Sequence, residues 1–136
     1  MEQRDYFLRQ IEQMGKVLGK ILARLFKFKS GNSAELTIES IEETFQNELE
    51  LNFHSLISLP NDDFIEILTV EKQFDNDSIE KLADIFYEMI PFYTSKAKQK
   101  SLSEKALILH TYLEEKNNTF SFERKLKIDE LRNMHF

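Results

Sequence analysis

The sequence predicts an all-α protein of about six helices, packed as antiparallel hairpins in a bundle or a superhelix. Three observations predict this class. The chain has 136 residues but only three glycines and two prolines, whereas strand-rich folds need many tight turns that draw on these residues. Apolar residues recur every three or four positions along most of the chain, which is the period of an α-helix. Clusters of Ser, Thr, Asn and Asp separate these stretches and suit helix N-caps.

The first predicted helix spans about residues 2–28. Its apolar residues form a heptad seam with spacings of four and three: Phe7, Ile11, Met14, Leu18, Ile21, Leu25 and Phe28. Residues 1–29 carry seven basic and three acidic groups, a net charge of +4. We expect this long basic amphipathic helix to fold back onto the rest of the chain. Gly31 suits the left-handed residue that follows a helix end.

Gly15 and Gly19 form a G-x-x-x-G motif within this first helix. In a lipid bilayer such a motif marks a close helix pair. In a helix this basic, we expect the two glycines to permit close packing against the protein's own body. Self-association and membrane contact remain as alternatives.

The middle of the chain, residues 34–75, is helical and acidic. A second helix is predicted over about residues 34–51, and a short third helix follows Pro60 over about residues 63–70. Residues 52–59 are ambiguous. The longer stretch 30–90 carries two basic and fifteen acidic groups, a net charge of −13, so a basic first helix can pack against a complementary surface.

The last part of the chain, residues 77–134, contains three predicted helices, over about residues 78–93, 101–116 and 122–134. Asp77 is the predicted N-cap of the first of these, and Glu80 completes a capping box. Pro91 should kink that helix or end it near Met89. Residues 95–100 read as a basic connector. The length of the chain is typical of one domain, so residues 1–136 are expected to form a single helical domain.

These last helices resemble tetratricopeptide-type (TPR) repeats. The residues that carry the resemblance are Leu82-Ala83, Phe86-Tyr87 and Glu104-Lys105-Ala106-Leu107, because a small alanine lets paired helices approach closely in that family. The segment Asp5-Tyr6-Phe7-Leu8-Arg9-Gln10-Ile11-Glu12-Gln13-Met14 also looks like the start of small bacterial proteins of unknown function with a TPR-like helical body. The resemblance implies a fold and supplies neither an activity nor catalytic residues.

The sequence contains no recognisable catalytic or metal-binding pattern. It has no cysteine, and its three histidines lie far apart, so neither thiolate nor paired-histidine metal sites are expected. The acidic residues of the second helix, such as Glu42 and Glu43, read as a solvated helix face. We therefore predict no catalytic residues, no cofactor and no metal, and a protein that is not an enzyme.

The leading functional hypothesis is an interaction module that holds a protein or peptide in a groove between helices. The candidate surface residues are Phe7, Ile11, Met14, Leu18, Tyr87, Tyr93 and Tyr112. One alternative is binding to a membrane surface, or self-association as a homo-oligomer, through the first helix. Another is an enzyme or ligand-binding protein whose pocket forms no sequence motif.

The charge and hydropathy patterns indicate which class of partner the protein binds and in which cell compartment it lies. Only the ends of the chain would attract phosphate, so nucleic acid is not an expected partner. Lys20, Arg24 and Lys27 interrupt the apolar run of the first helix, so neither a secretory signal nor a membrane span is expected. Membrane contact is not favoured, and we expect a cytoplasmic protein.

Overall fold

The computed structural model describes residues 2–31, 36–117 and 120–136. These residues form helices and no strand, so the predicted all-α class is confirmed. The α-helices are α1 (Glu2–Lys29), α2 (Ile38–Leu49), α3 (Phe53–Ile57), α4 (Phe64–Glu66), α5 (Asn76–Met89), α6 (Lys96–Lys116) and α7 (Phe122–Arg132). Three short 3₁₀ or π segments connect them: η1 (Asn61–Asp63), η2 (Ile67–Glu71) and η3 (Ile90–Phe92).

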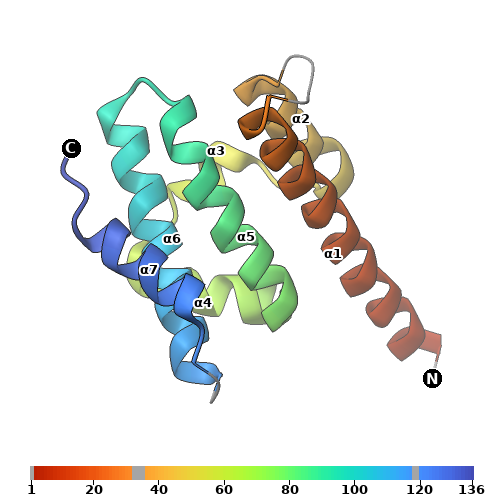
Figure 1. Ribbon diagram of the computed structural model, residues 1–136. Helices are drawn as coiled ribbons and strands as arrows, with labels where there is room; N and C mark the ends of the chain where they lie inside the picture. Colours follow the sequence, from red (N-terminus) through yellow and green to blue (C-terminus); the bar gives the residue numbers. More distant parts are fainter. Residues whose placement is uncertain (1, 32–35, 118–119) are drawn as a thin grey trace.

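The helices α5, α6 and α7 follow one another as antiparallel neighbours (Figure 1). The long helix α1 packs along the other side of α5 and runs in the same direction, because Gly15 lies beside Asp77 and Lys29 lies beside Glu88. The helix α2 returns along α1 (Figure 1). As a result α5 is covered on both sides, and α1 lies at one edge of the molecule.

Side-chain caps set the helix starts. The Thr37 hydroxyl accepts from the Ser40 N–H at 3.1 Å and begins α2. The predicted cap of α5 is wrong by two residues: the Asp75 carboxylate accepts from the Ser78 N–H at 2.9 Å, while Asp77 forms an ion pair with Lys81 at 2.9 Å. Asp75 and Asp77 are both suitable cap residues. Asp77 pairs with Lys81, and Asp75 is the residue that caps the helix.

The predicted connector 95–100 is also wrong. The Ser95 hydroxyl caps α6, which begins at Lys96 rather than near residue 101. Two other expectations about helix ends are confirmed. The helix α5 ends at Met89, just before Pro91, which lies in η3. Gly31 adopts a positive φ of 78° after α1.

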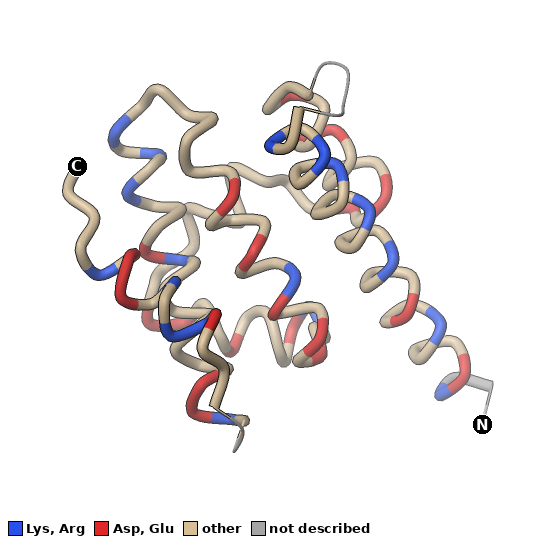
Figure 2. Tube along the Cα trace, in the orientation of Figure 1, with Lys and Arg blue, Asp and Glu red and all other residues tan. Residues whose placement is uncertain are grey.

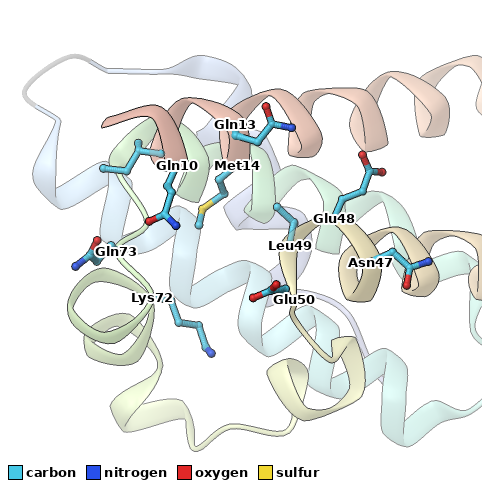
Figure 3. A pocket seen from close by; sticks show the side chains of 10 residues that line it. Gln10, Gln13, Met14, Asn47, Glu48, Leu49, Glu50, Lys72 and Gln73 are labelled. Carbon is cyan, nitrogen blue, oxygen red and sulfur yellow. The ribbon is translucent and has the colours of Figure 1, made fainter. Parts of the chain in front are cut away.

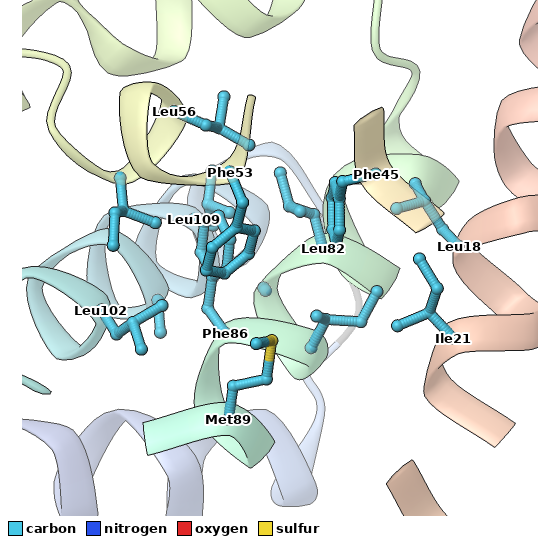
Figure 4. Packing of buried hydrophobic residues seen from close by; sticks show 14 of the residues in the cluster. Leu18, Ile21, Phe45, Phe53, Leu56, Leu82, Phe86, Met89, Leu102 and Leu109 are labelled. Carbon is cyan, nitrogen blue, oxygen red and sulfur yellow. The ribbon is translucent and has the colours of Figure 1, made fainter. Parts of the chain in front are cut away.

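The core is one cluster of apolar side chains to which every α-helix contributes. Four buried phenylalanines come from α2, α3, α4 and α5: Phe45, Phe53, Phe64 and Phe86. Phe45, Phe53 and Phe86 lie together in the cluster (Figure 4), and the Phe64 ring stacks on that of Phe86. The Phe53 ring lies 5.0 Å from the Phe45 ring and 5.7 Å from the Phe86 ring, measured between centroids. Leu18 and Ile21 of α1 complete the cluster at the α5 side (Figure 4).

Candidate interaction site

The helix α1 divides into a docked half, residues 15–29, and a projecting half, residues 2–14. In the docked half the side chains at most 2% exposed are Val17, Leu18, Ile21 and Leu25. The projecting half extends beyond the body of the molecule (Figure 1), and there Tyr6, Phe7 and Leu8 are 61%, 44% and 48% exposed. Phe26 and Phe28, at the end of the docked half, are 46% and 42% exposed. The projecting half differs in having three adjacent exposed apolar residues, and a contiguous apolar patch is a candidate interaction site.

A cleft of about 360 Å³ lies between the projecting half and the body (Figure 3). Its walls come from α1, from the end of α2 and from the turn after η2. The lining residues are Gln10, Ile11, Gln13, Met14, Asn47, Glu48, Leu49, Glu50, Lys72 and Gln73. Met14 and Leu49 also pack against the core, so they form the apolar floor of the cleft, and polar groups surround that floor.

Two residues in left-handed conformation shape the wall opposite α1. Glu50 ends α2 with a φ of 55°, and Gln73 follows η2 with a φ of 56°. Beside Glu50, the Leu51 N–H donates to the Phe45 carbonyl at 3.1 Å, six residues back, and the turn at Gln73 has the same bond at 2.9 Å. These bonds close the two turns, and the left-handed position that follows a helix is usually glycine. Glu and Gln at these positions gave no sequence signal for the two turns, so the sequence did not predict this wall.

The two halves of α1 also differ in charge (Figure 2). The docked half carries five basic groups and no acidic group, whereas the projecting half carries two basic and three acidic groups. In the docked half, Lys29 forms an ion pair with Glu88 at 3.5 Å. The cleft has two carboxylates, from Glu48 and Glu50, and one ammonium group, from Lys72. The bare end of α1 therefore faces a net acidic cleft.

Gly15 and Gly19 lie in the docked half, on the side of α1 that faces α5. The Lys81 side chain of α5 lies across both glycines, and its Nζ donates to the Gly15 carbonyl at 3.2 Å. A Cβ added at either position would meet no atom nearer than 3.7 Å. This is ordinary van der Waals contact, so the packing seen here does not require glycine.

The structure divides the predicted surface residues of α1. Phe7 is exposed in the projecting half, and Ile11 and Met14 line the cleft. Leu18 was predicted to belong to the same surface, but it is 0% exposed and lies in the core. The heptad seam includes all four residues. Their burial decreases from Leu18, which lies beside the other helices, to Phe7, which lies beyond the end of these helices.

The three predicted tyrosines do not join this surface, because none of them lines the cleft. Tyr93 is 5% exposed, and its hydroxyl donates to Glu42 at 3.0 Å. Burial, together with this hydrogen bond, raises the pKa of Tyr93. The Tyr87 hydroxyl is hydrogen-bonded to Glu130 of α7. Tyr112 packs against the core, with the Lys116 ammonium 5.8 Å from the centre of its ring.

Charged and polar groups attach α7 to α5 and α6. Arg124 is 7% exposed and forms ion pairs with Glu80 and Glu114 at 3.4 and 3.3 Å. Between these helices His110 is 2% exposed, and neither ring nitrogen has a hydrogen-bond partner in the described part of the chain. Burial lowers the pKa of His110 to about 4. A neutral, buried histidine fits a structural role in this interface.

Across residues 2–31, 36–117 and 120–136, no group of three or more acidic or histidine side chains is placed to hold a metal ion. No helix in the same ranges combines the length and the apolar character needed to cross a membrane. No protein-family model, curated protein or solved structure matches this chain. The TPR-like resemblance therefore stays a prediction, and the proposal below rests on the geometry of the site.

Proposed function

We propose that the protein is a non-enzymatic interaction module that binds an amphipathic helix of a partner protein at the projecting half of α1 and the cleft beside it. One observation carries the proposal. The apolar stripe of α1 continues from buried Leu18 through Met14 and Ile11 to exposed Phe7, beyond the edge of the body. Helices that dock in grooves use apolar anchors at this spacing. A partner helix would cover the bare end of the stripe as α5 covers the docked end.

The charges support a basic partner. The cleft lining is net acidic, and the projecting half has one more acidic than basic group. The protein already contains one such pairing, because the docked half of α1 carries a charge of +5 and packs beside a segment, residues 30–90, that carries −13. A partner helix with Lys or Arg beside an apolar face would repeat this pairing. Complementary charge of this kind favours the correct partner and speeds association.

Two alternatives use the same helix. Binding to an anionic membrane needs basic groups beside an exposed apolar face. In α1 this combination occurs at the last turn, where Phe26 and Phe28 are 46% and 42% exposed near Lys27 and Lys29, whereas the longer exposed stretch at Tyr6, Phe7 and Leu8 lies in the half with an acidic excess. Self-association has support from the heptad spacing of Phe7, Ile11 and Met14. However, about three turns from each of two copies would bury less than the ~1,200 Å² of a small specific interface. We therefore place self-association second.

Two expectations from the sequence belong to this proposal. The TPR-like resemblance is supported by Ala83 and Ala106, which are both 0% exposed on the paired helices α5 and α6. Close approach of such helices is what small residues permit. The proposal also keeps the cytoplasmic location expected from the sequence.

The experiment is a titration with two labelled peptides, followed by fluorescence anisotropy. One peptide is an amphipathic helix of Leu and Lys, and the other has Glu in place of every Lys. We expect the Leu–Lys peptide to bind and the Leu–Glu peptide to bind at least tenfold more weakly, because a like-charge juxtaposition disfavours the wrong partner. Equal binding of the two peptides would contradict the basic partner.

A matched pair of variants locates the binding. Phe7→Glu places a charge on the projecting half, and Phe122→Glu makes the same change on α7, where Phe122 is 67% exposed. Only Phe7→Glu should weaken the Leu–Lys complex, by about tenfold or more. A peptide held by general electrostatic attraction would instead bind both variants more tightly, because each adds a negative charge. Equal weakening by both variants would contradict binding at the projecting half. Light scattering on the wild type and on Phe7→Glu shows whether self-association uses the same surface.

A further inference from the structure

A second pocket, which we call the α5-end pocket, lies where α5 ends, between α1 and α7. Its volume is about 360 Å³, which lies within the usual range of small-molecule sites, about 300–1,000 Å³. The walls are largely apolar and come from Leu25, Phe28, Ile90, Pro91, Phe92 and Met134. Polar groups at the pocket come from Lys29, Tyr87, Glu88 and Glu130. The cleft beside the projecting half of α1 shares no lining residue with this pocket.

Glu88 is the most buried carboxylate of this pocket, and one long ion pair compensates its charge. Its side chain is only 12% exposed, and its ion-pair partner is Lys29, whose Nζ lies 3.5 Å away. The Lys29 side chain is itself 69% exposed, so it is solvated and free to leave. A carboxylate this well buried is stabilised by a close, hydrogen-bonded cation. The surroundings of Glu88 therefore favour an ammonium group that approaches from the pocket.

The aromatic residues of the pocket also favour a cation. The rings of Phe28 and Phe92 lie 5.2 Å apart, centre to centre. The third ring, that of Tyr87, already has the Lys127 ammonium 5.5 Å from its centre. Aromatic faces attract cations through their negative electrostatic potential. Glu130 adds a second carboxylate, which is hydrogen-bonded to the Tyr87 hydroxyl.

We propose that the α5-end pocket binds a small amphiphilic cation, with its apolar chain among Leu25, Phe28, Phe92 and Met134 and its ammonium group on Glu88. The bound ammonium displaces Lys29 from the Glu88 carboxylate. This site does not depend on the helix-binding function proposed above, because it lies on different residues.

The test uses three probes with the same eight-carbon chain: octylammonium, octanol and octyl sulfate. Each is kept below the concentration at which it forms micelles or, for octanol, a separate phase. Each is titrated into the full-length protein, and binding is followed by backbone amide chemical shifts of residues 25–29, 87–92 and 130–134. We expect octylammonium to bind about tenfold more tightly than octanol, because a hydrogen bond to a charged group is added. Octyl sulfate should bind most weakly. Equal affinity for the three probes, or shifts located elsewhere, would overturn the proposal.

Two variants should change the affinity in opposite directions. Glu88→Gln keeps the shape of the side chain but removes its charge. The affinity for octanol should therefore persist, while the affinity for octylammonium should fall to that for octanol. Lys29→Ala removes the competing ammonium and should strengthen octylammonium binding about twofold to fivefold, as expected for a surface ion pair.

The exposed neighbour Lys27 supplies the control for Lys29→Ala, because Lys27→Ala removes the same charge from the same helix and should leave the affinity unchanged. If Lys27→Ala and Lys29→Ala act equally, the effect is general electrostatics and the proposed role of Glu88 is wrong. If Glu88→Gln keeps the full preference for octylammonium, the proposal is also wrong. Octanol binding verifies that the pocket remains intact in each variant.

Discussion

The two halves of α1 follow one sequence pattern and have opposite surroundings. The heptad seam runs without interruption from Phe7 to Phe28, yet Leu18 is fully buried while Leu8, on the same helix, is 48% exposed. The basic charge lies in the half whose apolar stripe is buried at Leu18, Ile21 and Leu25, although Phe26 and Phe28 at its end are 46% and 42% exposed. The projecting half has a slight acidic excess. The docked half anchors the helix to the acidic body, and in our proposal the projecting half is left to bind a partner.

The largest difference between the halves should appear in stability. Leu18→Ala removes a fully buried side chain and should lower the free energy of unfolding by about 2–5 kcal/mol. Leu8→Ala is the same change on an exposed side chain and should alter it by no more than about 0.5 kcal/mol. Urea denaturation followed by circular dichroism measures both. If Leu8→Ala costs as much as Leu18→Ala, the projecting half is packed against something, and the division of α1 is wrong.

Acid should lower the free energy of unfolding of the helical body against which the docked half packs. Burial lowers the pKa of His110 to about 4 in the folded protein, against an ordinary 6.5; Asp84 opposes this shift, and Lys127 and Arg124 add to it. As the pH falls, His110 becomes protonated in the unfolded chain before it does in the folded protein. Protonation of the unfolded chain therefore lowers the free energy of unfolding, which is unaffected well above pH 6.5 and falls progressively as the pH approaches 4. Between pH 7.5 and pH 5 the free energy of unfolding should fall by about 2 kcal/mol from this residue.

The His110→Leu variant isolates that effect. Its free energy of unfolding should lose this part of the pH dependence, whereas the control His54→Gln, at an exposed histidine, should retain it. The measurement is urea denaturation at the two pH values. A wild-type stability unchanged between pH 7.5 and pH 5 would show that His110 is not held in a neutral state by burial.

The smallest expected effect concerns the glycines of the docked half. Gly19→Ala should raise the free energy of unfolding by about 0.5–1 kcal/mol, because alanine is the better helix former. The added methyl group meets only the end of the flexible Lys81 side chain, at 3.9 Å. Binding of the Leu–Lys peptide should be unchanged. A loss of stability, or a change of oligomeric state in light scattering, would instead assign the G-x-x-x-G motif to a helix–helix contact.

Much of the fold was predictable from local signals. The first helix, predicted over residues 2–28, spans Glu2–Lys29, and the last predicted helix begins at Phe122 as expected. Pro91 and Gly31 act as predicted because their backbone preferences are local. The start of α6 was misplaced because three serines, at positions 95, 101 and 103, can each serve as a cap, and only packing selects Ser95.

The candidate site was less predictable, because its position depends on where the body ends. The periodicity identified Phe7, Ile11 and Met14 as apolar, but it could not distinguish them from Leu18, which is buried by α5 and the rest of the core. The opposite wall depends on left-handed Glu50 and on the turn after η2. Glutamate and glutamine rarely adopt that conformation and give no local signal for it, so this wall became visible only in the structure.

The most direct test of the division of α1 is an NMR titration of the wild-type protein with the Leu–Lys peptide. The account predicts chemical-shift changes confined to residues 4–14, 47–50 and 72–73, with the docked half and α7 unaffected. Shift changes at α7, or no saturable binding at all, would contradict the claim that the projecting half of α1 and its cleft form the interaction site.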